Sequence, residues 1–527
     1  MTLKLLTFCT FISILIACQA PENQVLAQYP SINLLITNGL ILDGSGLEPV
    51  VGDVVVVGDE IVFVGKTAFT DEDLKIRVKS HIDANKRIIA PGFIDLHSHG
   101  NPLETPIFEN FLAMGITTIT LGQDGDSPPV PKLIDWLSQV EDQGISLNLA
   151  MFVGHGTLRD ISGIGRQVDP KKADLELMLS ILDETLDYTF GLSTGLEYNP
   201  GLNAQSPELQ ALAKIVGKHQ RLIMSHVRNE DDDQIAASIA ELIEQGEHAR
   251  VHIAHLKSVY GRDDVAAEKI LEILDEARDR GIDISADLYP YNASYTGISI
   301  VFPVWAKTLE QFETAKRERR PELEDFLRRK ITRRNGPEAT LLGTAPYTGK
   351  TLADLSREFE MPYEQVLIDI IGPNGAAGAY FVMDDKLQTR LLIDPNISYS
   401  SDGRQEGFHP RGHGAFAKII EEYVIKRQIL SLPEAIRKMT SQSANILNIS
   451  DRGWLKEGYK ADILIFEPSK VKALATYPMP HQLALGFDIV IVNGNIVREN
   501  GVLSDGLFGR VLKPSNLHLS KVVNEKQ

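Results

Sequence analysis

Short apolar runs that end in polar residues alternate with helical patterns through the middle of the chain. This alternation is typical of βα units, in which parallel strands are connected by helices. Eight such runs can be counted, and a closed (β/α)8 barrel requires that number. We therefore expect an α/β protein with a TIM-type barrel over residues 88–449, with strands at 88–97, 117–122, 147–154, 188–194, 222–226, 251–255, 282–289 and 397–402.

Both ends of the chain carry patterns of β-hairpins. In residues 32–44 (INLLITNGLILDG) apolar residues flank Asn38-Gly39, and in residues 487–500 (FDIVIVNGNIVREN) they flank Asn493-Gly494. Asn-Gly between apolar runs is the strongest short-range hairpin signal. Residues 453–467 predict a further strand pair beside the second hairpin. We expect one small β-sandwich module that is built from both chain ends, residues 30–87 and 450–512.

The stretch over residues 304–396 is too long for a simple connection between a strand and a helix. Its charged segment, residues 316–334, has a helical pattern on either side of Pro321. This pattern predicts a cap that is inserted into the barrel.

The N-terminus has the pattern of an export signal. Lys4 precedes an apolar run of 13 residues, from Leu5 to Ala17, and about 20 are needed to span a bilayer as a helix. The run closes on Leu15-Ile16-Ala17-Cys18, which resembles the lipobox of bacterial lipoproteins. We expect a lipoprotein-type signal over residues 1–17, export, and a periplasmic or membrane-anchored product that touches membrane only through lipid on Cys18. An ordinary cleavable signal, cut after Ala20 or Ala27, remains an alternative.

Composition then narrows the partners and the chemistry. The 527 residues are 43% hydrophobic and 24% charged, and a formal net charge of -18 opposes binding to nucleic acid or to anionic membrane surfaces. The two cysteines, Cys9 and Cys18, both precede the predicted fold. A metal site in the folded body must therefore use His, Asp, Glu or a modified Lys.

Polar residues follow several of the predicted barrel strands. The active sites of TIM barrels lie where the strands end, so these side chains should meet at one mouth of the barrel. Residues i and i+2 of a strand share a face, which lets His97 and His99 reach the same ion. A cluster of this kind is costly to bury unless a divalent metal satisfies it. The candidate ligands are His97, His99, Asp124, His226, His255 and Asp402.

These positions lie within motifs of a known family. Residues 90–99 (APGFIDLHSH) resemble the opening motif of the amidohydrolase superfamily. Five further motifs resemble the D-aminoacylase (N-acyl-D-amino-acid deacylase) family, and the resemblance covers roughly residues 33–500. They are GLSTGLEY at 191–198, SHVRNE at 225–230, AHLK at 254–257, DLYPY at 287–291 and HPR at 409–411.

The resemblance implies an amide hydrolase that uses one or two zinc ions and acts on a small N-acyl amino acid or dipeptide. By position, His226 and His255 match the ligands of a tight metal site, and His97 and His99 with Asp402 match a second, weaker one. Asp402 also matches the general base. The family's groups for the substrate α-carboxylate match Lys257, Tyr289 and Arg411.

One position departs from the family pattern. Where the D-aminoacylases carry Gly-Asn-Cys-Gly, this chain reads Gly122-Gln123-Asp124-Gly125. A carboxylate is a harder ligand than a thiolate, and it can bridge two ions. The number and identity of the metals and the D-amino-acid assignment therefore stay open.

Other functions remain to be weighed. Hydantoinases and dihydroorotases bridge their metals with a carboxylated lysine near the end of strand four, but no lysine occurs between Lys172 and Lys214. An isoaspartyl-type or D-dipeptidase, or a mononuclear deaminase of the same superfamily, would use a related site. A catalytically silent periplasmic binding lipoprotein is the alternative that is not an enzyme. Because only the cysteine position departs from the family pattern, an active hydrolase is favoured.

Overall fold

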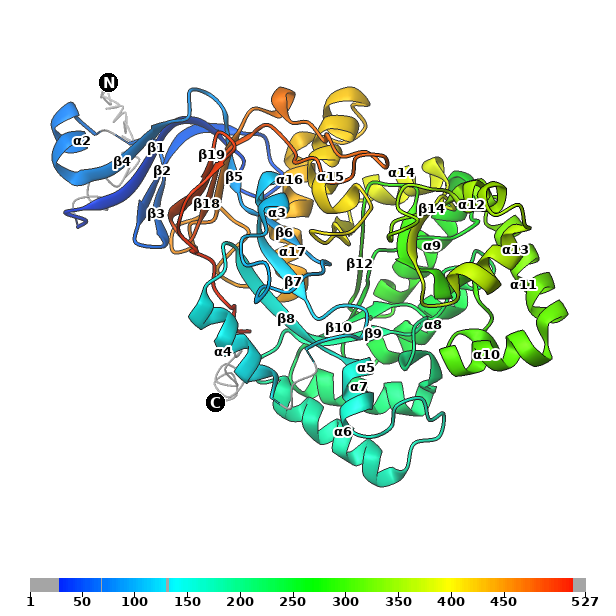
Figure 1. The fold of residues 1–527 in the computed structure, drawn as a ribbon. Coiled ribbons are helices and arrows are strands. Elements are labelled where there is room, and N and C mark those ends of the chain that lie inside the picture. Colours follow the sequence, from blue (N-terminus) through cyan, green and yellow to red (C-terminus); the bar gives the residue numbers. More distant parts are fainter. Residues whose placement is uncertain (1–27, 68, 129–131, 515–527) are drawn as a thin grey trace, which may run out of the picture.

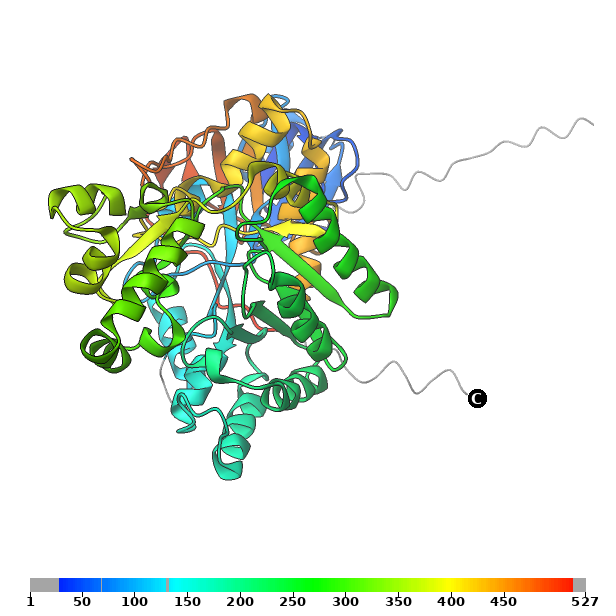
Figure 2. The same ribbon diagram turned by 90° about the vertical axis from the view of Figure 1, so that its right-hand side faces the viewer.

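The computed structural model describes residues 28–67, 69–128 and 132–514. Its centre is an eight-stranded parallel sheet in which each strand pairs with the next along the chain (Figures 1 and 2). Beyond the first and last strands, the Asp402 N–H donates to the His97 carbonyl at 2.8 Å, which brings the two edges together. The predicted barrel is confirmed, with strands β6 (Phe93–Asp95), β7 (Ile116–Leu121), β8 (Asn148–Gly154), β9 (Gly191–Gly195), β10 (Leu222–His226), β11 (Arg250–Ile253), β12 (Ile284–Leu288) and β16 (Ile397–Tyr399).

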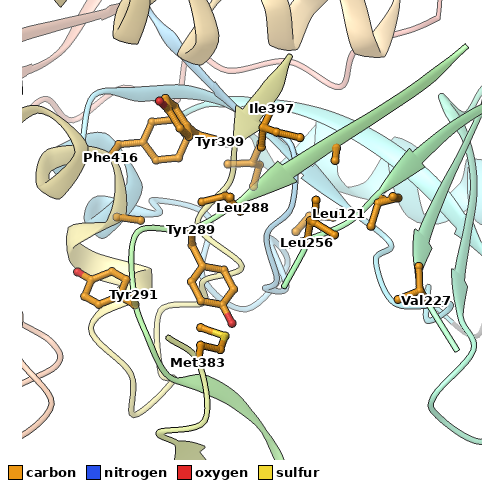
Figure 3. Close-up of a cluster of buried hydrophobic side chains, with 14 of the residues drawn as sticks. Leu121, Val227, Leu256, Leu288, Tyr289, Tyr291, Met383, Ile397, Tyr399 and Phe416 are labelled. Atoms are coloured by element: carbon orange, nitrogen blue, oxygen red, sulfur yellow. The ribbon is translucent and has the colours of Figure 1, made fainter. Parts of the chain in front are cut away.

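Amphipathic helices follow the strands and cover the outside of the barrel (Figure 1). Except for α17, whose Ala444 and Leu447 join a smaller cluster, their apolar residues join one large buried cluster. The strand residues Leu121, Leu288 and Ile397 in Figure 3 also belong to the large cluster. Burial of this continuous core is the main stabilising contribution to the barrel. The helices are α3 (Glu109–Ala113), α4 (Leu133–Gln143), α5 (His155–Ile161), α6 (Lys172–Thr185), α7 (Ser206–Lys218), α8 (Ile235–Gly246), α9 (Asp263–Asp279), α14 (Asp385–Ile393), α15 (Arg411–Lys418), α16 (Leu432–Met439) and α17 (Ser441–Leu447).

Strands from both chain ends form a second, nine-stranded mixed sheet, as predicted. Blue and red strands lie side by side in Figures 1 and 2. The sheet closes around its own apolar cluster, which includes Ile36, Ile463 and Ile491. Its path is β20 (Val502–Leu503), β19 (Asn495–Glu499), β18 (Phe487–Val492), β17 (Ile463–Phe466), β5 (Ile88–Pro91), β1 (Ile32–Ile41), β2 (Val50–Val57) and β3 (Glu60–Gly65); β4 (Val78–Asp83), which follows helix α2 (Asp71–Arg77), pairs with β1.

The hairpin predicted at Asn38-Gly39 is wrong. Strand β1 continues through both residues, and its pairing with β2 shifts register between Ile36 and Gly39. Asn38 has φ 57°, so the dipeptide forms a bulge inside a long strand. The same dipeptide at Asn493-Gly494 does join β18 to β19 as predicted. Of the strand pair expected in residues 453–467, one strand, β17, forms.

The first predicted strand, residues 88–97, is two strands that belong to different sheets. β5 pairs with β1 and β17 in the module, whereas β6 pairs with β7 in the barrel. Gly92 separates them, and a Cβ at this position would lie 2.1 Å from the Thr117 hydroxyl oxygen. The module is therefore attached directly to the start of the first barrel strand.

Between β12 and β16 the chain leaves the barrel, and its helices project from one side (Figures 1 and 2). Pro321 stands in the first turn of a helix that begins at Arg320, which agrees with the helical pattern around it. The bounds given for the cap stay a prediction. The elements are β13 (Ser294–Gly297), α10 (Leu309–Glu318), α11 (Arg320–Arg333), β14 (Thr340–Leu342), α12 (Leu352–Glu358), α13 (Tyr363–Val366) and β15 (Ala377–Tyr380).

The predicted export signal and Cys18 lie outside the described residues. Within the described ranges, no helix combines the length and the apolar character that crossing a bilayer requires.

Candidate metal centre

The six predicted metal ligands meet at the mouth where the barrel strands end. His97 and His99 follow β6, His226 is the last residue of β10, and His255 lies two residues beyond β11. Asp124 and Asp402 lie three residues beyond β7 and β16. Parallel strands put their carboxyl ends at the same edge, so ligands that are up to 305 positions apart in the sequence (His97 and Asp402) become neighbours.

His97, His99, Asp124 and Asp402 form one group in which each residue offers a ligand atom within 4.8 Å of the others. The His99 Nε2 atom lies 3.5 Å from Asp124 Oδ2 and 3.3 Å from Asp402 Oδ1. The His97 Nε2 atom lies 3.4 Å from Asp124 Oδ1. Two imidazoles and two carboxylates around one point are a suitable ligand set for a divalent ion.

Asp124, His226 and His255 form a second group that shares Asp124 with the first. Asp124 Oδ1 lies 3.6 Å from His226 Nδ1 and 3.3 Å from His255 Nε2. The two imidazoles lie 3.0 Å apart, measured from His226 Nδ1 to His255 Nε2. Asp124 thus stands between two clusters of histidine nitrogens, where one carboxylate can bridge two ions.

Three of these ligands have left-handed backbones. The φ angles are 55° at Asp124, 36° at His255 and 47° at Asp402. Such φ values are uncommon outside glycine and costly, and they cluster at functional sites because the surrounding structure imposes them. The left-handed backbone at these three residues indicates that the directions of their side chains matter more here than local backbone stability.

The residues present fit a bound cation. Both ring nitrogens of His97 are buried without a hydrogen-bond partner in the described structure, and such atoms require satisfaction. Burial opposes charge on Asp124, yet the neighbouring histidines, His97 first, hold its pKa well below the ordinary value. Burial also lowers the pKa of His226, but Glu230, Asp124 and Glu197 outweigh it and raise that pKa to about 10. The cluster therefore attracts positive charge, which a divalent ion supplies.

Two buried aspartates orient the ligands from behind. Asp287 accepts the His255 backbone N–H at 2.9 Å, and Asp95 accepts the His97 N–H at 3.2 Å. Asp95 also accepts the Ser401 N–H at 2.9 Å, one residue before Asp402. Because carboxylates hold the backbones of ligands on both sides of the barrel seam, the site is positioned before anything binds.

The residues predicted to hold a substrate carboxylate lie beside the metal ligands. Lys257 Nζ lies 2.5 Å from Glu230 Oε1, and Arg411 Nη1 lies 2.5 Å from Asp402 Oδ2. The Tyr289 hydroxyl is buried with no hydrogen-bond partner in the described structure. Figure 3 shows its ring extending from the end of β12, where Leu288 belongs to the apolar core. The two cations already have protein partners, whereas the phenol has none.

Sequence reasoning gave no role to Glu230 or Glu197. With His226 they form a third group of possible ligands, and Glu197 Oε2 lies 3.2 Å from His226 Nε2. Burial opposes charge on Glu230, but Lys257 and the nearby histidines lower the pKa of this carboxyl below the ordinary range. Both glutamates lie in motifs that carried the family resemblance, SHVRNE and GLSTGLEY, and this was the available signal.

One cavity of about 490 Å³ at the barrel mouth is lined by five of the six predicted ligands, all but His97, and by Glu197, Glu230, Lys257, Tyr289 and Arg411. Other walls come from residues between β12 and β16, among them Tyr295, Ile300 and Arg334. Concave sites of this size accommodate small molecules. The geometry thus places a polar pocket directly over a cluster suited to two metals.

A model of the amidohydrolase family matches residues 353–498. The chain is 28% identical over 490 residues to N-acyl-D-glutamate deacylase of Alcaligenes xylosoxydans xylosoxydans, covering 88% of this chain and 93% of the relative. It is 29% identical over 515 residues to N-acyl-D-aspartate deacylase of the same organism, covering 92% and 95%. A crystal structure of N-acyl-D-glutamate deacylase from Bordetella bronchiseptica, complexed with zinc and a phosphonate inhibitor, superposes with a TM-score of 0.78 at 26% identity, covering 92% of this chain and all of that one.

The chain resembles the D-aminoacylase family of the amidohydrolase superfamily. The likeness extends over the barrel and the module alike, so the module is part of the shared architecture. Where the D-aminoacylase motif has cysteine, this chain has Asp124, whose carboxylate lies close to the histidines of both ligand groups.

Proposed function

We propose that the protein is a metal-dependent amide hydrolase that removes the acyl group from N-acyl-D-amino acids. The observation that carries the proposal is the pair of ligand groups that share Asp124 beside Asp402, at the mouth of the barrel. The resemblance to N-acyl-D-glutamate and N-acyl-D-aspartate deacylases supports the choice of substrate.

We propose zinc as the metal, because the histidines and carboxylates are ligands it takes and because the Bordetella bronchiseptica relative was crystallised with it. The first group (His97, His99, Asp124 and Asp402) and the second (Asp124, His226 and His255) would each hold one ion. A zinc ion at such a site lowers the pKa of water to about 7 and polarises a carbonyl oxygen.

Asp402 would act as the proton carrier. Burial opposes its charge, but Arg411 and the histidines keep the pKa of its carboxyl well below the ordinary value, so it is ionised and can accept a proton. It would take the proton from the attacking water and deliver it to the departing amine, which avoids expelling an amide anion. The unpaired Tyr289 hydroxyl and Lys257 would orient the substrate α-carboxylate, together with the Arg411 guanidinium.

The test combines elemental analysis with release of free amine from paired N-acetyl-D- and N-acetyl-L-amino acids, before and after chelation. The proposal requires bound metal and release from the D series that stops on chelation and returns with zinc. Bound metal without release from either series would overturn the deacylase assignment and favour the dipeptidase and deaminase alternatives.

We also propose that the chain is exported and anchored through lipid on Cys18. The support is the apolar run ending in Leu15-Ile16-Ala17-Cys18. The Cys18→Ser protein should appear in the soluble exported fraction or stall as precursor, whereas the parent should fractionate with membranes. Unchanged membrane attachment of the variant would contradict the anchor.

A further inference from the structure

One buried cation in the cavity has no carboxylate partner. The Arg334 side chain lines the cavity, and the residue is 4% exposed. In the described part of the chain no carboxylate lies within 4.0 Å of its guanidinium, and its Nε atom is buried without a hydrogen-bond partner. A buried charge is expensive unless an opposite charge accompanies it.

The other buried cations of the cavity are already compensated. Lys257 contacts Glu230, and Arg411 contacts Asp402, each at 2.5 Å. Even the residue next in sequence is paired, since Arg333 lies 2.9 Å from Asp232 at the surface. Arg334 is thus distinguished from its neighbours by the absence of a carboxylate.

The protein holds the Arg334 guanidinium in a defined position. The residue is the C-cap of α11, and its backbone N–H donates to the Lys330 carbonyl. The next side chain, Asn335, donates to the Phe381 carbonyl at 2.7 Å, which ties this end of the helix to the segment after β15. The guanidinium lies 4.8 Å from the centre of the Tyr380 ring, and such stacking orients a guanidinium and stabilises its charge.

The cavity offers little to an apolar side chain. Its aliphatic lining is limited to Pro200, Val259, Ile300 and Ala377, and no Leu, Met, Phe or Trp side chain lines it. The remaining apolar surface comes from the rings of Tyr198, Tyr289 and Tyr295, each of which carries a polar hydroxyl. A large apolar amino-acid side chain would therefore gain less apolar contact here than in a pocket lined by leucine or phenylalanine. The walls are suited to a substrate whose side chain is polar.

We propose that Arg334 selects N-acyl-D-amino acids with an acidic side chain by forming an ion pair with the side-chain carboxylate. This inference rests on the proposed deacylase function and names its substrate class. The planar guanidinium can bind a carboxylate through two parallel hydrogen bonds, and the bound substrate then supplies the counter-charge that the protein lacks. An amide in place of the carboxylate has the same shape but no charge, so the site discriminates against it.

The test compares N-acetyl-D-glutamate with N-acetyl-D-glutamine. For the zinc-loaded parent we expect kcat/KM to favour the acid by at least about tenfold, the effect of one charge-assisted hydrogen bond. Arg334→Gln should lower kcat/KM for the acid by about 10- to 100-fold and change that for the amide by less than about threefold. Arg334→Lys, which keeps the charge without the planar fork, should retain part of the preference.

Arg333→Gln is the matched control. It removes the same charge at the adjacent residue, which lies at the surface and is paired with Asp232. It should leave the preference intact. Equal loss for both substrates in Arg334→Gln would overturn the proposal, because it would place the guanidinium on the common α-carboxylate. A parent enzyme without preference for the acid would overturn it too.

Binding measurements distinguish a failure of this inference from a failure of the proposed deacylase function. Calorimetry with zinc-loaded Asp402→Asn protein should show tighter binding of N-acetyl-D-glutamate than of the amide, and Arg334→Gln in the same background should abolish the difference. If the parent hydrolyses neither compound yet this selectivity holds, the deacylase assignment fails and the Arg334 inference stands. If the parent hydrolyses N-acetyl-D-amino acids with neutral and acidic side chains at the same rate, the deacylase assignment stands and the Arg334 inference fails.

Discussion

Asp402 contacts both a predicted metal ligand and a cation of the cavity. Its Oδ1 lies 3.3 Å from His99 Nε2, and its Oδ2 lies 2.5 Å from Arg411 Nη1. We expect Asp402→Asn to lower kcat by about 10²- to 10⁴-fold, the usual contribution of a proton carrier, because an amide cannot accept the proton. The metal content should stay unchanged, because each ligand group keeps three metal-binding side chains without Asp402. Steady-state rates and elemental analysis of the same preparation check both points.

Asp126→Asn is the control for that variant. Asp126 is exposed and lines the same cavity but belongs to neither ligand group, so its loss changes the charge without touching the cluster. Its rate should remain within about threefold of the parent, as for groups that make no hydrogen bond in the transition state. Normal turnover of Asp402→Asn would contradict the mechanism.

Asp124 can be tested by restoring the family's residue. Asp124→Cys replaces a hard, bridging carboxylate with a soft thiolate at the point shared by both groups. We expect the variant to bind cadmium more tightly, relative to manganese, than the parent does. Competition titrations with the two ions measure the shift, and Asp126→Cys, outside both groups, should show none. An unchanged ratio in Asp124→Cys would argue against direct ligation by Asp124.

At this scale the sequence predicted which residues the structure brings together, but not all of their contacts. His97 and His99 stood out because the same-face spacing in a strand is a local property. Glu230 could not be assigned in this way, because its contacts with Lys257 and His255 join the loops that follow two different strands. Arg334 belongs to the charged segment whose helical pattern predicted a cap, and only the folded chain places its side chain at the cavity.

Among the elements, the β18–β19 turn is fixed to the barrel by a buried polar network. Asn493 in the turn donates to Asn148 Oδ1 of β8 at 2.8 Å and accepts from Arg452 Nη2 at 2.8 Å. Asp462 binds Arg452 Nη1 and accepts the Asn148 amide at 2.9 Å. Each of these four side chains forms a hydrogen bond or ion pair with another of the four. Removing any one of them would therefore leave a buried polar atom without a partner at the contact between module and barrel.

We expect Arg452→Met to lower the free energy of unfolding by about 3–5 kcal/mol, because it leaves the carboxylate of Asp462 buried and unpaired. Urea denaturation followed by circular dichroism measures the change. Lys172→Met is the control, since Lys172 pairs with Glu176 at the surface and its side chain is 88% exposed. Its unfolding curve should match that of the parent, and equal losses in the two variants would contradict the argument.

Strand pairing explains why one Asn-Gly dipeptide forms the predicted hairpin and the other does not. At Asn493 the dipeptide stands where two antiparallel strands meet, whereas at Asn38 the flanking residues remain in one strand that pairs with β2, β4 and β5. Bending a strand that serves three partners requires a bulge, and Asn with positive φ supplies one. The Asn-Gly dipeptide correctly indicated a left-handed backbone at both positions, but the strand pairing determined whether a bulge or a hairpin turn formed.

For the whole molecule, the barrel was predictable because eight runs with strand-end polar residues repeat along the chain. The boundary between module and barrel was not, because residues 88–97 form one apolar run that serves both sheets. Only close packing against Thr117, which demands glycine at position 92, separates the two. The segments between β12 and β16 lack a repeating pattern, and their place over the cavity depends on tertiary contacts such as the ion pair between Lys330 and Asp231.

Metal binding should stabilise the entire chain, because the ligands come from strands at opposite sides of the barrel and from its closing seam. Without a cation, Asp124 and Asp402 share one cluster, and His97 keeps two buried unsatisfied nitrogens. At a free zinc concentration 100 times the dissociation constant, binding adds about 2.7 kcal/mol to the free energy of unfolding.

We therefore expect zinc to raise the Tm of the protein by several degrees and chelation to reverse the shift, as measured by scanning calorimetry. Asp124→Ala should lose most of the shift, because it removes the ligand shared by both groups. His481→Gln should keep it, since His481 contacts His413 outside either ligand group and thereby controls for weak zinc binding to surface histidines. An equal shift in parent and Asp124→Ala would mean that the stabilising ion binds elsewhere, and the two ligand groups would then have to be abandoned as the metal centre.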